Sequence, residues 1–181
     1  MKFNVTLSAT LFVIAASVSA APTTTQPKGF FSVAPGAPEG LYTHHVSLDG
    51  TLHTEYHGKP NLTSSSHHTL SQGSRHTKRD RALGVVCQNL VFTASDAQNA
   101  VAGLANALNT SPTFYHSISY TSGTATAYGC DYSSGQTISG PAMSDYLDLV
   151  KLRCGDSKEG YYGFGPDNAA YGITTSGSGF C

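Results

Sequence analysis

All four cysteines of this 181-residue chain, Cys87, Cys130, Cys154 and Cys181, lie between residue 87 and the last residue. An even number of cysteines within about 100 residues is typical of the disulfide framework of a small secreted domain. The spacings of 43, 24 and 27 residues contain no CxxC pair, which argues against a structural zinc site. We therefore expect two disulfides, no metal and no cofactor, with three possible connectivities.

The first 20 residues read as a secretory signal peptide. Lys2 precedes an apolar run, and small residues lead up to Ala20, after which we expect cleavage. Threonines and serines interrupt the run, so it is too short for a membrane anchor, and no later segment is long and apolar enough to span a bilayer. The expected location is extracellular, with no membrane span.

Residues 21–79 are rich in proline, glycine, serine, threonine and histidine and contain few large aliphatic residues. Such a composition buries too little apolar surface to offset the entropy of ordering, so we expect a disordered propeptide. The segment ends in the dibasic pair Lys78-Arg79, a cleavage site for a kexin-type processing protease. This predicts a mature domain over residues 80–181. The alternative is a basic patch on an unprocessed surface.

The histidine content also changes at Arg79. Seven of the eight histidines precede Arg79: His44, His45, His53, His57, His67, His68 and His76. They are capable of binding a metal or of sensing pH, but we interpret them as part of a discarded polar linker. Two glycosylation motifs are present, at Asn61 in "NLT" and at Asn109 in "NTS".

Residues 80–181 are acidic. They contain four lysines and arginines against eight aspartates and glutamates, a formal charge of −4. This balance argues against a nucleic acid as the main partner, because binding to a phosphate backbone needs positive charge.

Local patterns predict an α+β domain. Residues 84–92 are typical of a buried strand, 113–121 and 124–132 of a hairpin, and 159–165 and 169–177 of terminal strands. Helices are expected over 95–108, with Ser95 and Gln98 as a capping box, and over 141–155. The order favours a small disulfide-bonded sandwich with two helices on one face of an antiparallel sheet, a βαββαβ-like layout.

In that layout the first and last strands are antiparallel neighbours. Cys87 could then reach Cys181, while Cys154 on the second helix could reach Cys130 on the sheet beneath it. Each closure would stabilise the domain by about 3 to 4 kcal/mol in the chain-entropy model.

Several features of residues 84–181 recur together in one known family. They are a cysteine on the first strand, a helix begun by Ser-Asp, "YGCDY" at 128–132, "SDYLDLV" at 144–150 and a glycine-rich end at Cys181. This combination resembles the fungal necrosis-inducing effector domain, which is related in fold to the killer toxins of smut fungi. That family usually has a cysteine in its first helix, where this chain has Ala97, so its disulfide pattern cannot be copied.

"TASDA", "FYHS" and "YGITTSGSGFC" are similar to segments of the fungal guanyl-specific ribonucleases. Acid–base cleavage of RNA needs two proton-transfer groups near the scissile phosphate. Thr174 and Thr175 stand where that family has its late catalytic histidine, and Gly129 and Cys130 where it has its glutamate. The resemblance therefore implies a catalytically dead version.

The remaining candidates favour binding over catalysis. His116 alternates with apolar residues and is expected on the half-buried face of a strand, with Asp131 or Glu159 as the only partners for an acid–base role. Tyrosines are abundant, and Tyr115, Tyr161 and Tyr162 are candidate interface residues.

We expect a non-catalytic secreted effector or virulence protein that binds a host protein or cell-surface target, or induces host cell death. A killer-toxin-like antimicrobial protein and a ribonuclease-like enzyme or pseudoenzyme are the alternatives.

Overall fold

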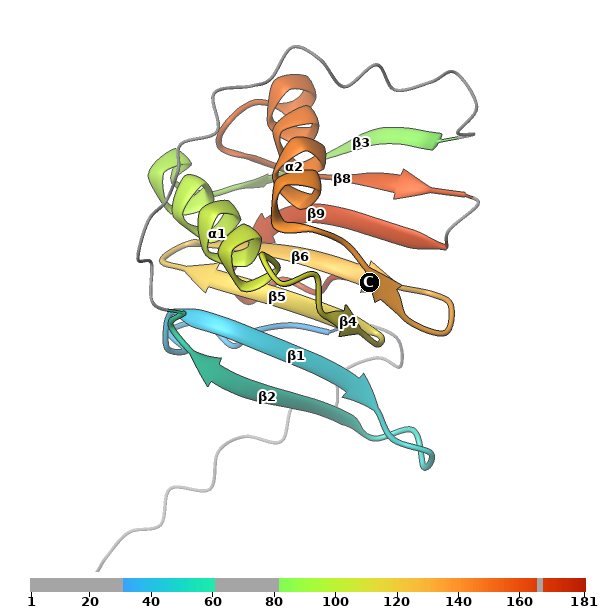
Figure 1. Cartoon of the computed structure of the whole chain (residues 1–181). Coiled ribbons are helices and arrows are strands. Elements are labelled where there is room, and N and C mark those ends of the chain that lie inside the picture. Colours follow the sequence, from blue (N-terminus) through green and yellow to red (C-terminus); the bar gives the residue numbers. More distant parts are fainter. Residues whose placement is uncertain (1–30, 61–81, 166–167) are drawn as a thin grey trace, which may run out of the picture.

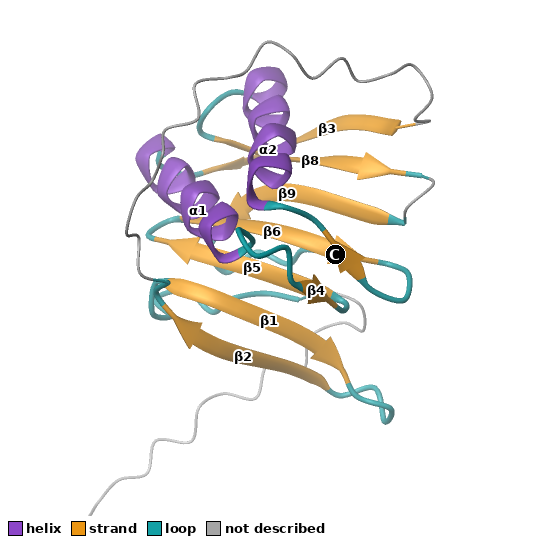
Figure 2. Ribbon diagram, in the orientation of Figure 1, coloured by secondary structure: helices purple, strands orange, loops and turns teal. Residues whose placement is uncertain are grey.

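The structure, a computed structural model, describes residues 31–60, 82–165 and 168–181. Seven antiparallel strands form one sheet in the order β2-β1-β5-β6-β9-β8-β3, and two helices lie side by side on one of its faces (Figures 1 and 2). The strands are β1 (Gly40–Val46), β2 (Leu52–Gly58), β3 (Ala82–Val91), β5 (Ser117–Ser122), β6 (Ala125–Asp131), β8 (Lys158–Phe164) and β9 (Ala169–Thr175). This confirms the α+β class with two helices on an antiparallel sheet.

The first helix, α1 (Ala94–Ala107), covers β5 and β6. Its apolar residues at helical spacing, including Val101 and Leu104, are buried against the sheet. Gly103 allows close packing, since a Cβ atom there would lie 2.4 Å from the Tyr120 ring. The predicted capping box is wrong: the helix begins at Ala94, with Thr93 as its N-cap and no side-chain cap bond.

The second helix, α2 (Gly140–Cys154), covers β8, β9 and β3. The Ser139 side chain accepts a hydrogen bond from the Ala142 N–H, and Pro141 occupies the first turn, where its missing N–H costs nothing. Met143, Leu147 and Val150 are fully buried. Two short strands in the sequence between the helices, β4 (Thr113–Phe114) and β7 (Gln136–Thr137), pair with each other in a separate two-stranded sheet.

The opposite side of the sheet, here called the far face, has its own small core. Phe31, Tyr128, Cys130, Ala170 and Phe180 pack together there. Phe31 and Phe180 form a reciprocal backbone bridge, with N–O distances of 2.9 and 2.8 Å. The segments before β1 and after β9 therefore cover the centre of this face.

The predicted disorder of residues 21–79 is wrong for residues 31–60. β1 pairs with β5 on one side and with β2 on the other, so its backbone hydrogen bonds are satisfied on both edges. Tyr42 and His44 alternate inward along β1 and are buried. Docking against β5 supplies the burial that the composition of this segment could not provide alone.

The suggested disulfide pairing is also wrong, although two disulfides are present. Cys87 bonds Cys154, and Cys130 bonds Cys181. β9 lies between β6 and β8, while β3 is at the sheet edge beside β8. Cys87 therefore lies beneath the end of α2, and the chain after β9 folds back over the far face to reach Cys130.

Candidate functional site

A groove opens between the β1–β2 hairpin and the segment that follows α1, with a volume of about 350 Å³. We call it the hairpin groove. Its lining residues are Leu41, Thr43, His44, His45, His57, Ala107, Pro112, Thr113, Phe114, Tyr115 and Ile118. One wall thus comes from residues 31–60 and the other from the disulfide-bonded part of the chain.

The hairpin wall follows from strand alternation. Leu41, Thr43 and His45 point to the helix side of the sheet, while Tyr42 and His44 point to the far face. The turn between the strands is fixed by Asp49, whose Oδ1 accepts hydrogen bonds from the Ser47 hydroxyl and the Thr51 N–H at 2.7 and 2.9 Å. These bonds lower the pKa of Asp49 to about 2.

The groove has an apolar floor and a polar rim. Phe114 and Ile118 are buried at its base, and Leu41 is half-buried. On the rim, His57 Nε2 hydrogen-bonds Thr43 Oγ1 at 2.7 Å, and Tyr115 is 60% exposed. Concave sites with apolar linings and a few polar groups are the common form of binding sites.

His45, which lines the groove, is paired with a second histidine, His53, on β2. The rings of His45 and His53, directly paired across β1 and β2, stack with centroids 4.9 Å apart and an interplanar angle of 11°. Within the described residues, no group of three or more His, Cys, Asp or Glu side chains is arranged to hold a metal ion.

The groove carries imidazoles, hydroxyls and a phenol, and its lining includes no carboxylate or thiol. His57 is bonded to a threonine hydroxyl on the neighbouring strand, a contact that orients the ring. The arrangement suits the enclosure of an apolar or aromatic side chain, with hydrogen bonds at its edge.

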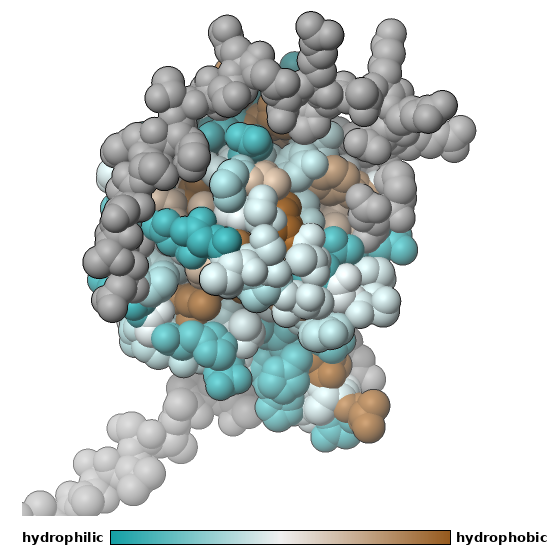
Figure 3. Space-filling model, in the orientation of Figure 1, coloured by the Kyte–Doolittle hydropathy of each residue, from teal (hydrophilic) through white to brown (hydrophobic). Residues whose placement is uncertain are grey.

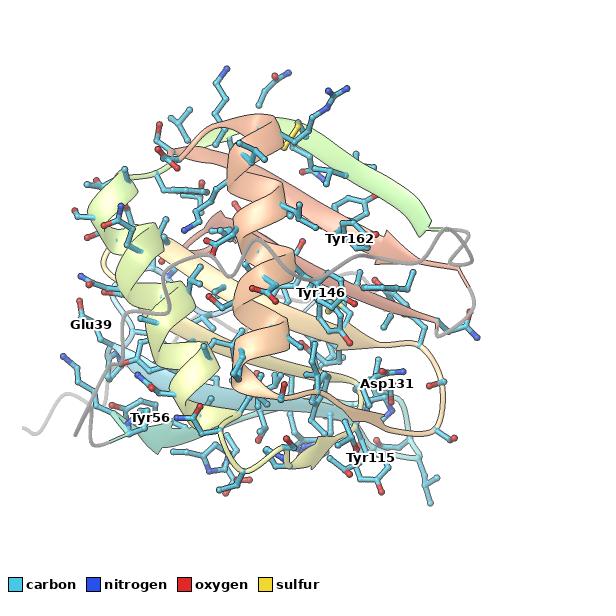
Figure 4. The ribbon with its side chains drawn as sticks, turned by 45° about the horizontal axis from the view of Figure 1, so that its top comes forward. Glu39, Tyr56, Tyr115, Asp131, Tyr146 and Tyr162 are labelled. Atoms are coloured by element: carbon cyan, nitrogen blue, oxygen red, sulfur yellow. A yellow bond between two sulfur atoms is a disulfide. The ribbon has the colours of Figure 1, made fainter. Side chains whose placement is uncertain are left out.

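The three candidate interface tyrosines lie in different places. Tyr115 is on the groove rim near the hairpin, whereas Tyr162 lies beside α2 (Figure 4). Tyr162 packs against Tyr146, with ring centroids 5.2 Å apart, and lines a shallow depression with Val85 and Leu152. Tyr161 belongs to the far-face cluster. Only Tyr115 contributes to the hairpin groove.

His116 is not on a half-buried strand face as expected. It is exposed, has a left-handed backbone with φ of 64°, and interrupts the chain between β4 and β5. Its Nδ1 accepts a hydrogen bond from the Val46 N–H at 3.4 Å. The Asp131 carboxylate is held by the Ser133 N–H and hydroxyl, and Glu159 lies three strands away on β8. Neither carboxylate forms an acid–base pair with His116.

The far face carries buried polar residues that the sequence did not reveal. His44, Ser119, Thr126, Thr174 and Glu159 are each at most 4% exposed. Among the buried side chains described, Glu159 Oε2 and Thr174 Oγ1 have no hydrogen-bond partner. Burial raises the pKa of Glu159. The Asp-Gly pair at 49–50, between the short segments "GLYTHHV" and "LHTEYHG", is the signal that could have found the hairpin.

The remaining sequence candidates are outside the groove. Ala20, Asn61 and the Lys78-Arg79 pair lie outside the described residues. Asn109 is exposed just after α1, and its amide donates to Asn106 Oδ1 at 3.4 Å.

The face over the helices shows several small hydrophobic areas in a largely hydrophilic surface, and no broad one (Figure 3). Of the helices in the described part of the chain, neither is long and apolar enough to cross a bilayer. The hairpin groove combines an apolar floor with polar groups at its rim.

Searches with protein-family models, among curated proteins and among solved structures find no match for this chain.

Proposed function

We propose that this protein is secreted, processed at Lys78-Arg79, and acts outside its producer by binding a target protein through the hairpin groove. The observation that carries the proposal is the groove itself, which is lined at its base by Leu41, Phe114 and Ile118. The rim hydroxyls and imidazoles add directional contacts. These features support a binding role, and we assign the groove no catalytic step.

The resemblance to the necrosis-inducing effector domain specifies the biological role. We propose a fungal effector that engages a host protein or cell-surface target and provokes host cell death. Two disulfides stabilise such a small domain outside the cell, where thiols are oxidised.

Tyr115→Ala tests the groove, because this exposed tyrosine can lose its ring without leaving a cavity in the core. Tyr132→Ala is the matched control, since Tyr132 is 54% exposed and does not line the groove. The secreted proteins are infiltrated into plant leaves over a dilution series, and lesion area is scored. Exposed aromatic anchors often contribute about 2 kcal/mol or more to binding, so Tyr115→Ala should need at least a roughly 10-fold higher dose.

Equal activity of the two variants would rule out the groove as the binding site. Absence of lesions with the unaltered protein, together with growth inhibition of competitor yeasts, would favour the killer-toxin-like alternative. RNA hydrolysis by the unaltered protein that is lost in His116→Ala would contradict the non-catalytic proposal.

A further inference from the structure

Residues 31–60 have no covalent link to the rest of the described structure except through the main chain. Both disulfides join residues within 82–181. A single cut anywhere between Pro60 and Ala82 would therefore divide the protein into two polypeptides. The contacts across that division decide whether the two would separate.

The first contact is strand pairing. β1 is hydrogen-bonded antiparallel to β5 in a register that runs from Gly40 opposite Thr121 to His44 opposite Ser117. Every residue of β5 is buried in the structure. Without β1, the backbone N–H and C=O groups on this edge of β5 would lose their hydrogen-bond partners, which is costly.

The second contact is the aromatic cover of the far face. Phe31 and Val33 are 6% and 2% exposed, and Phe31 packs with Tyr128 and Phe180. The same phenylalanine is fixed by its two backbone hydrogen bonds to Phe180. Removing residues 31–60 would expose this apolar surface to water.

The third contact is His44, which is fully buried and joins the two parts. Its Nε2 hydrogen-bonds Ser119 on β5 at 2.8 Å, and its Nδ1 hydrogen-bonds Thr54 on β2 at 3.0 Å. Its ring contacts Phe31 and Phe180, with centroid distances of 5.4 and 5.3 Å. Both ring nitrogens are thus satisfied inside the interface.

The fourth contact lies at the start of β1. Glu39 Oε1 accepts hydrogen bonds from the Gly123 N–H at 3.1 Å and the Ser122 hydroxyl at 3.4 Å, in the turn between β5 and β6. Together these contacts hold both ends of the β1 segment and its centre.

We propose that residues 31–60 stay bound to residues 82–181 after cleavage of the segment between them, so that the working protein is a non-covalent two-chain molecule. The partner of the β5 edge and of the far face is the protein's own excised N-terminal segment. The inference rests on the proposed processing. It also preserves the hairpin wall of the groove, but it does not depend on the proposed target.

The same interface is sensitive to acid through His44. Burial, with a smaller contribution from His45, lowers the pKa of His44 from its usual 6.5 to about 4. The groups facing the ring are Thr54 from β2, Ser119 from β5, and the rings of Phe31, Tyr42 and Phe180, none of which carries a negative charge at neutral pH. Protonation therefore favours the separated state, in which the imidazole is solvated.

The sign of the effect follows from the lowered pKa. Attachment is strongest above pH 6.5, weakens as the pH falls from about 6.5 towards 4, and changes no further through this group below that value. The dissociation constant should rise on the order of 100-fold between pH 7 and pH 4.

The test uses the full secreted chain with a sequence-specific protease site placed between residues 61 and 79, so that the cut does not depend on the natural dibasic pair. The cut protein is passed through gel filtration at pH 7, and each fraction is analysed by intact mass. The expected result is co-elution of the two polypeptides in a 1:1 ratio. Elution of the 82–181 part alone would overturn the proposal.

The acid response is tested with His44→Gln, which keeps hydrogen-bonding capacity but cannot be protonated. His53→Gln is the matched control, because His53 is an exposed histidine on the same hairpin. Dissociation of the cut proteins is followed over a concentration series at pH 7 and pH 4. Loss of the pH difference in His44→Gln alone is expected. Equal pH responses in all three proteins would show that His44 does not cause the acid response. Whether the two polypeptides stay together at pH 7 is decided separately, by the gel filtration of the unaltered protein.

Discussion

The N-terminal hairpin and the disulfide-bonded body belong to one sheet but are held by different means. The body, residues 82–181, has both disulfides and two helices that cover its strands. The hairpin has no disulfide, only its inner strand β1 contacts α1, and most residues of its outer strand β2 are exposed. Its order depends on what it contacts: the β5 edge, the far face and Phe180. A segment poor in aliphatic residues can therefore be well ordered when a folded neighbour supplies the surface to bury.

The largest effects should come from the disulfides, which also distinguish the two regions. Removing either bond, as Cys87→Ser with Cys154→Ser or Cys130→Ser with Cys181→Ser, should cost about 4 kcal/mol of unfolding free energy. Only the second pair should also loosen the hairpin, because Cys181 follows Phe180, the partner of Phe31. Denaturant unfolding gives the stability, and amide hydrogen exchange of β1 gives the loosening. Equal exchange in the two double variants would contradict this separation.

Phe31→Ala should act on the hairpin more than on the body. The phenylalanine is 6% exposed and packs in the far-face cluster, so its truncation should cost about 3 kcal/mol. The loss should appear as faster hydrogen exchange in β1, with exchange in β6 and β9 little changed. Leu48→Ala in the fully exposed hairpin turn is the control and should change stability by less than about 0.5 kcal/mol. A uniform increase in exchange across all strands would show that hairpin and body unfold as one unit.

Glu159→Gln addresses the body alone and should have the smallest effect. Burial raises the pKa of this carboxyl, so its ionisation costs stability as the pH rises above its unfolded value of 4.5 and through its folded value. The neutral amide removes that cost and should raise the stability of the protein at pH 7. At pH 4 the native carboxyl is protonated, and the difference should largely vanish. Thermal unfolding at both pH values measures it, and destabilisation at pH 7 would contradict the argument.

Local periodicity predicted the two helices and the central hairpin of the body, but it was wrong for residues 84–92. These were expected as a buried strand, whereas β3 is at the sheet edge and its residues 86–91 are exposed. The helical spacing of Leu104 on α1 and of Leu147 on α2 correctly indicated their buried faces. The hairpin of β5 and β6 was also correct, although β4 separates from it and pairs with β7. The buried helix faces and the hairpin depend on residues close together in the sequence, and local sequence patterns can predict such features.

The errors concern contacts between distant parts of the chain. The pairing of Cys87 with Cys154 depends on β9 lying between β6 and β8, and no local pattern encodes that strand order. Residues 31–60 were interpreted as disordered because composition was given more weight than the Asp-Gly turn signal at 49–50. The hairpin groove was missed for the same reason, since one of its walls belongs to that segment.

If the proposed secretion and cleavage take place, the pairing of β1 with β5 also has a consequence for the order of folding and cleavage. Tyr42 is opposite Ser119, so the hairpin is synthesised well before the strand it binds, and such distant contacts form late in folding. While the chain is intact, the connection keeps the hairpin near β5 at an effective concentration that is typically in the millimolar range. A cut made after folding releases an assembled pair, whereas a cut made before folding leaves two fragments to find each other at cellular dilution. The timing of the protease, as much as its specificity, would set the yield of complete molecules.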